Sequence, residues 1–96
     1  MRVLYDSNAD AIEITFIDVA RVERDVSVHV CGTVSLSGGR PVGVELLEAS
    51  GGVDAAVRAI VAAYGTLDAD ALRAAACAAL AAPDKQLVLT IAAHAA

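Results

Sequence analysis

Residues 1–18, MRVLYDSNADAIEITFID, contain two candidate strands with a turn between them. Within residues 11–17 apolar residues alternate with polar ones, which predicts a strand with one buried face and one solvent-exposed face. Residues 2–5 form a shorter strand candidate. Between them lie Asp6 and Asp10, and aspartate side chains hydrogen-bond to nearby backbone amides in tight turns. This stretch therefore predicts a β-hairpin.

Residues 18–25, DVARVERD, are polar and charged and are interpreted as a connection, after which the same alternation returns up to residue 46 and predicts further strands. Residues 26–36 alternate with Gly32 in their middle, and we interpret this glycine as a bend or bulge within one strand. Residues 37–40, SGGR, are typical of a hairpin turn, because glycine reaches positive φ without a steric penalty. Residues 41–46 supply the next strand. The connections are too short for crossover helices, so we expect an antiparallel arrangement.

The second half of the chain has a different composition and predicts helices. Eighteen of the 22 alanines lie in residues 51–96, and alanine favours helix. Apolar residues recur with helical spacing over residues 53–64, and a second, alanine-rich helix is expected to end before Pro83. Residues 86–91, QLVLTI, are expected to form a final strand, although an apolar helix also fits their pattern.

These patterns predict one α+β domain over residues 1–96. A β-rich part, residues 1–50, holds an antiparallel meander of about four strands. An alanine-rich part, residues 51–96, holds two helices and the final C-terminal strand. Only 3% of the residues are aromatic, so we expect a thin core that gains stability from self-association, such as a homodimer.

Charge and composition restrict the partners and the compartment. The net charge is −5 and the seven basic residues are scattered, which argues against direct nucleic-acid binding and favours a basic protein partner. No apolar run has the length of a signal peptide or of a membrane span, so we expect no membrane association and a cytoplasmic location. Cys31 and Cys77 lack a disulfide-framework spacing and are expected to be free thiols.

Two motifs resemble a known family. They are YDSNADAIEITF, residues 5–16, and PVGVELLEAS, residues 41–50. Members of the small prokaryotic domain-of-unknown-function family twenty-two eighty-three carry Y-D-x-x-x-D-A before an alternating strand and V-G-I-E-I-L-x-A-S in a later one. The resemblance covers residues 1–50. Members usually carry several acidic residues before the glycine of the hairpin, whereas residues 35–40, SLSGGR, contain none. It implies a small β-sheet domain without established activity, linked through gene neighbourhood to toxin–antitoxin-like pairs.

Asp6 and Asp10 are the first candidates for chemistry. A carboxylate pair can hold a metal ion or transfer protons, but this stretch lacks the central glycine and the twelfth-position glutamate of a calcium loop. We therefore interpret Tyr5, Asp6 and Asp10 as residues of the turn and of the family motif.

Cysteine and histidine supply the second set of candidates. His29, Cys31, Cys77 and His94 have the composition of a zinc ligand set, but they lack its usual close spacing. His29 beside Cys31 is also the one sequence-local pair of a base and a nucleophile. Weighing both sets against their structural roles, we assign no catalytic, cofactor-binding or metal-binding residue and expect no cofactor.

The sequence therefore favours a non-enzymatic protein-interaction or oligomerisation module, in an antitoxin-like role. We expect an acidic β-surface of Glu13, Glu45 and Glu48 to meet a basic partner, with the helices carrying oligomerisation. The alternative is a small-ligand-binding or enzymatic domain with a pocket between sheet and helices.

Overall fold

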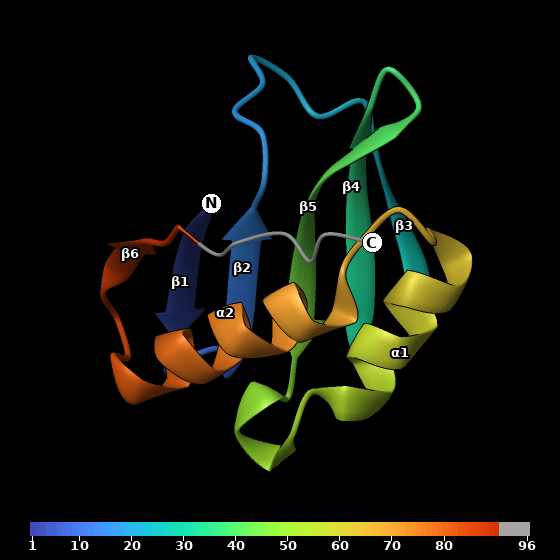
Figure 1. Cartoon of the computed structure of the whole chain (residues 1–96). Helices are drawn as coiled ribbons and strands as arrows, with labels where there is room; N and C mark the ends of the chain where they lie inside the picture. Colours follow the sequence, from blue (N-terminus) through green and yellow to red (C-terminus); the bar gives the residue numbers. More distant parts are fainter. Residues whose placement is uncertain (91–96) are drawn as a thin grey trace.

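The computed structural model describes residues 1–90, so His94 and the end of the expected last strand lie outside the described residues. The described chain forms a six-stranded sheet and two α-helices, with one 3₁₀ turn, η1 (Figure 1). In chain order the elements are β1 (Arg2–Asp6), β2 (Ala11–Thr15), β3 (Arg24–His29), β4 (Gly32–Ser37), β5 (Arg40–Leu47), η1 (Ala49–Gly51), α1 (Asp54–Ala63), α2 (Ala69–Ala81) and β6 (Gln86–Val88). The predicted α+β class is confirmed, with more strands than expected.

The chain reverses direction at residues 30–31, where the sequence predicted a bend within one strand. β3 ends at His29, β4 begins at Gly32, and the two strands pair antiparallel. Val30 lies at the tip of this hairpin and is 85% exposed. The prediction of one strand over residues 26–36 is therefore wrong. Its apolar alternation resumes in the same phase after the two-residue turn, so periodicity alone does not reveal the turn.

The sheet has the strand order β3-β4-β5-β2-β1-β6, and every neighbouring pair is antiparallel. The β1–β2 hairpin and the β3–β4–β5 meander are therefore joined through the β2–β5 pair. Residues 16–23 connect β2 to β3 at the far edge, passing the ends of β5 and β4 (Figure 1). The backbone N–H groups of Phe16 and Ile17 donate to the Val42 carbonyl at 2.8 and 3.2 Å, which fixes the start of this connection to β5.

The turn and the final strand that the sequence predicted are both present. Gly38 and Gly39, between β4 and β5, have φ values of 59° and 74°, as a two-residue hairpin turn with left-handed residues requires. β6 pairs with β1 in the register Leu4 to Gln86, so the described part of residues 86–91 includes a strand rather than a helix.

Both helices cover the same face of the sheet (Figure 1). α1 contacts β3 and β4, whereas α2 contacts β1 and β2. The alternating strands turn their apolar side toward the helices, and this layer forms the core. Its largest fully buried side chains are Ile12, Ile14, Leu46, Ile60, Leu72, Val3, Val34 and Val57. The opposite face of the sheet carries no helix among the described residues.

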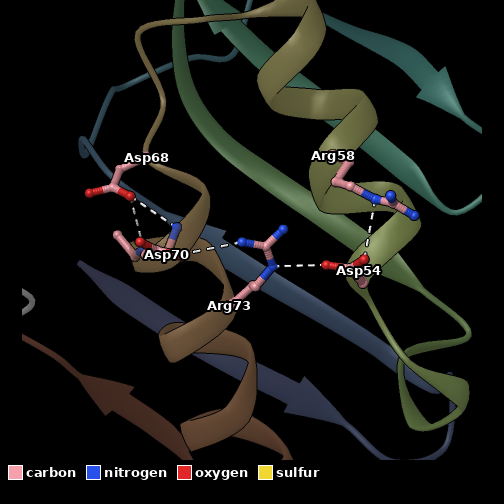
Figure 2. Close-up of polar contacts among 6 residues, drawn as sticks. Asp54, Arg58, Asp68, Asp70 and Arg73 are labelled. Atoms are coloured by element: carbon pink, nitrogen blue, oxygen red, sulfur yellow. Dashed lines mark hydrogen bonds and ion pairs between the residues drawn. The ribbon is translucent and has the colours of Figure 1, made fainter.

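Exposed charges join the two helices at their amino-terminal ends (Figure 2). Asp68 caps α2, because its Oδ1 accepts the backbone N–H of Asp70 at 2.9 Å. The Arg73 Nε of α2 donates to Asp54 Oδ1 of α1 at 2.9 Å, and Asp54 also pairs with Arg58. Solvent-exposed ion pairs of this kind contribute little to stability, so the helices depend mainly on apolar packing.

Candidate functional site

We call the sheet face opposite the helices the open face. Two rows of its side chains cross all six strands, following the pairing register. From β3 to β6, the first row is Asp25, Ser35, Gly43, Thr15, Arg2 and Val88. The second row is Ser27, Thr33, Glu45, Glu13, Leu4 and Gln86. The rows combine hydroxyl groups with three carboxylates, and Arg2 is their single base.

A hollow of about 450 Å³ lies on the open face, where the rows meet the β2–β3 connection. Gly43 lies between Thr15 and Ser35 in the first row, so the middle of the hollow carries no side chain. Its volume lies within the range of about 300–1,000 Å³ that is usual for ligand sites. The expected pocket was between the sheet and the helices, whereas this hollow lies on the other side of the sheet.

Apolar residues of the connection form one side of the hollow. We call them the loop wall; they are Ile17, Val19 and Val22, which are 46%, 37% and 41% exposed. An ion pair between Arg2 of β1 and Asp18 ties the loop wall to the sheet. The hollow is therefore amphipathic, with a polar, acidic floor and an apolar side.

Glu13 and Glu45 are directly opposite each other on β2 and β5. Both are exposed and both line the hollow. Neither forms an ion pair or a side-chain hydrogen bond with any of residues 1–90. Like charges directly opposite each other on neighbouring strands are destabilising. A bound cation would therefore relieve the repulsion between the Glu13 and Glu45 carboxylates.

Glu48 lies apart from the other two predicted acids. β5 ends at Leu47, and Glu48 then adopts a left-handed φ of 51°, so the strand alternation no longer determines where its side chain points. Its Oε2 accepts a hydrogen bond from Cys31 Sγ at 3.3 Å, beside the β3–β4 turn. The structure thus brings together Glu13 and Glu45 and separates Glu48 from them.

The Cys31 thiol has the properties of a structural cysteine. The hydrogen bond to Glu48, and secondarily burial, raises the pKa of this thiol above its ordinary value. A raised pKa disfavours the thiolate, which is the reactive form. His29 Nδ1 accepts the backbone N–H of Cys31 at 3.0 Å, so this nitrogen is not free to take a proton from the thiol. His29 and Cys31 therefore do not form an activated nucleophile.

Tyr5, Asp10 and Ser50 form a hydrogen-bonded network at the opposite end of the strands from the β2–β3 connection. Asp10 Oδ1 accepts the Tyr5 hydroxyl at 2.7 Å and the Ser50 backbone N–H at 2.9 Å, and its Oδ2 accepts the Ser50 hydroxyl at 2.7 Å. These bonds, chiefly that from the Ser50 hydroxyl, lower the pKa of Asp10. Residues 5–16 and 41–50, which carry the family resemblance, are joined by this network.

The remaining aspartates of this region also bind backbone and hydroxyl groups. Asp6 Oδ1 accepts the backbone N–H of Asn8 at 3.0 Å and of Ala9 at 3.2 Å within the β1–β2 turn. Asp84, which precedes β6, accepts both the Ser7 backbone N–H, at 2.9 Å, and the Ser7 hydroxyl. Tyr5, Asp6 and Asp10 are therefore engaged in holding the turn and its neighbours.

The ionised Asp10 carboxylate is expected to stabilise the fold at neutral pH and to lose this effect in acid. Its pKa lies below 3.8 in the folded chain, so the stabilisation is complete above that value and is lost as the pH falls through the folded pKa. Asp10→Asn should melt about 5–10 °C below the natural chain at pH 7. Asparagine tolerates the left-handed φ of 50° at this position, so backbone strain does not obscure the comparison.

Melting curves followed by circular dichroism between neutral and strongly acidic pH test this expectation. The gap in melting temperature between the two proteins should shrink as the pH falls below about 3.8. A gap that stays constant over the whole range would mean that the charge of Asp10 does not matter.

The loop wall, Asp25 and Gly43 are parts of the hollow that we did not predict. The loop wall lies in a segment that contains several charges, which we interpreted only as a connection. The sequence could have indicated Gly43, because glycine within a strand often marks a site where another backbone approaches closely. A Cβ at Gly43 would lie 2.8 Å from the Ile14 carbonyl oxygen of β2, which is closer than real contacts allow.

Within residues 1–90 no three His, Cys, Asp or Glu side chains gather so that they could hold a metal ion, and Cys77 is exposed on α2. No helix of the same residues is long and apolar enough to cross a membrane. Comparisons with family models, with curated proteins and with solved structures find no match to this chain.

Proposed function

We propose that the chain is a non-enzymatic protein-interaction module whose open face binds a basic segment of a partner protein. The observation that carries this proposal is the pair of Glu13 and Glu45, side by side at the hollow and without a cation among residues 1–90. A cationic partner would relieve their mutual repulsion, and the net charge of −5 would favour its approach over longer distances.

The other features of the chain fit a binding module better than an enzyme. The thiol of Cys31 has a raised pKa, and the carboxylate of Asp10 has a lowered pKa and three hydrogen-bond donors. Neither group is suited to act as a nucleophile or as a general base near neutral pH. The proposed setting is a reducing cytoplasm, where both cysteines would remain free thiols.

The family resemblance suggests the kind of partner. If residues 1–50 have the relationship that their motifs imply, an antitoxin-like role would pair this acidic chain with a basic protein. Two copies of this chain would repel each other through their open faces, because both present Glu13 and Glu45. We therefore propose that a homodimer, if formed, uses another surface.

Replacing Glu13 and Glu45 together by glutamine is expected to weaken binding of a basic peptide about tenfold, because each removed charge contributes a few tenths to about 1 kcal/mol at an exposed site. The probe is a fluorescein-labelled peptide in which arginine and lysine alternate with glycine. Fluorescence anisotropy at about 50 mM salt measures the affinity under conditions of limited screening.

Glu23→Gln/Glu48→Gln is the matched control, because it removes the same charge from two exposed residues that do not line the hollow. This control should bind the peptide nearly as well as the natural chain. If the two double variants lose affinity equally, only net charge matters and the open face is not the binding site.

A small organic ligand is the second candidate, because the hollow has a suitable volume. It would occupy the same site on the open face, so the same charge variants would affect it. The size of the probe that binds best separates this candidate from a protein segment.

A further inference from the structure

We propose that the open face receives an arginine side chain of the partner, with its guanidinium group between Glu13 and Glu45 and its methylene groups against the loop wall. This inference rests on the proposed function and specifies which basic residue the hollow selects. Three features of the described residues support it.

The first feature is the spacing of the two carboxylates. Directly opposite residues of an antiparallel pair have Cβ atoms about 5 Å apart, so Glu13 and Glu45 project side by side from the same face. A guanidinium group is planar and presents five N–H donors along its edges, so it can donate to both carboxylates at once. A lysine ammonium group is a compact point charge that lacks this fixed fork.

The second feature is the loop wall. Six large hydrophobic residues are exposed within residues 1–90, and three of them, Ile17, Val19 and Val22, lie on this one connection and line the hollow. Exposed apolar groups that gather beside polar ones mark interaction sites. Long basic side chains place their methylene stems on such surfaces while the charged end remains with polar partners.

The third feature is the part of the sheet that lines the hollow at Gly43 and Thr33. Gly43 lines the hollow and leaves the position between Thr15 and Ser35 without a side chain, so a stem can lie over this glycine, which is itself buried. Thr33 is directly opposite Glu45 on β4, and it also lines the hollow. Its hydroxyl oxygen offers an additional acceptor for an N–H group that the carboxylates leave unused.

The test uses three peptides of identical sequence whose central residue is arginine, lysine or glutamine, and a capped single arginine as a fourth probe. Affinities are measured by titration of ¹⁵N- and methyl-labelled natural protein. The arginine peptide should bind about fivefold tighter than the lysine peptide, and the glutamine peptide weakest. Binding should shift the methyl signals of Val19 and Val22.

Two variants separate the parts of the site. Glu45→Gln should reduce the preference for arginine over lysine, because one of the two carboxylates is lost. Val22→Ser should lower the affinities for the arginine and lysine peptides by the same factor, because the methylene stems of both residues would pack against the loop wall. The melting curve of each variant shows whether it is folded before its affinity is compared.

The outcomes distinguish this inference from the proposed function. Equal affinity for the arginine and lysine peptides overturns the arginine assignment and leaves a general basic-segment module standing. Capped arginine that binds as tightly as its peptide overturns a protein segment as the occupant. Failure of both basic peptides to bind better than the glutamine peptide overturns the inference and the proposed function together.

Discussion

Replacing Leu72 by alanine is expected to lower the free energy of unfolding by about 3 kcal/mol. The buried residues of α2 are Leu72, Ala75, Ala76 and Ala79, so Leu72 is the one large side chain that this helix buries fully. Alanine contributes little apolar area, and the removed leucine would leave a cavity in the core between the helices and the sheet. For a domain of this size, whose total stability is about 5–15 kcal/mol, this loss is severe.

Chemical denaturation monitored by circular dichroism measures this change, and Leu80→Ala is the matched control. Leu80 lies on the same helix but is only partly buried, so its truncation should cost about 1 kcal/mol. Equal effects of the two substitutions would show that α2 does not depend on Leu72 for its attachment to the sheet.

Replacing Gly43 by alanine is expected to destabilise the chain by about 1–3 kcal/mol, although alanine is the smallest possible addition. The new Cβ would lie 2.8 Å from the Ile14 carbonyl oxygen and 3.6 Å from Thr15 Cα, both of which belong to the backbone of β2. Backbone atoms cannot rotate away as a side chain can, so β2 and β5 would have to separate. The β2–β5 pair joins the two parts of the sheet, so its disturbance affects the whole fold.

Gly51→Ala provides the control for this substitution. A Cβ at Gly51 would have no atom within 4 Å, and its backbone φ lies outside the left-handed range, so the change should be close to neutral. Thermal melting of the two variants side by side tests the difference. A Gly43→Ala variant as stable as Gly51→Ala would mean that β2 and β5 tolerate wider spacing than their contacts indicate.

Local patterns in the sequence predicted most elements of the fold. The alternation around Ile12 and Ile14, the glycine turn at residues 37–40 and the helical spacing over residues 53–64 each depend on near neighbours in the chain. The reversal at residues 30–31 was missed because the pattern keeps its phase on both sides of it. Strand order could not be predicted, because the β2–β5 pairing depends on contacts between distant segments.

The candidate site was predictable only in part, because it also depends on contacts between distant segments of the chain. Alternation placed Glu13 and Glu45 on the polar faces of their strands, but only the pairing register makes them neighbours. Glu48 was grouped with them because the pattern does not show that β5 ends one residue earlier. The network of Tyr5, Asp10 and Ser50 joins residues 40 positions apart in the chain, which no local motif can reveal.

The arrangement of helices connects the fold to the proposed function. Because α1 and α2 cover one face of the sheet, their apolar contacts stabilise the core and leave the two polar rows on the other face available. The β2–β3 connection has to pass two intervening strands, and its exposed apolar residues thereby reach the border of the open face. The amphipathic hollow is thus a consequence of the strand order.

Mapping of amide chemical shifts during titration with the basic peptide tests most directly whether the open face is the binding surface. The largest shifts are predicted at Glu13, Thr33 and Glu45 and along the loop wall, while exposed residues of α2 such as Ala74 and Ala81 stay unchanged. Shifts concentrated on α1 and α2, with the open face unaffected, would contradict the account.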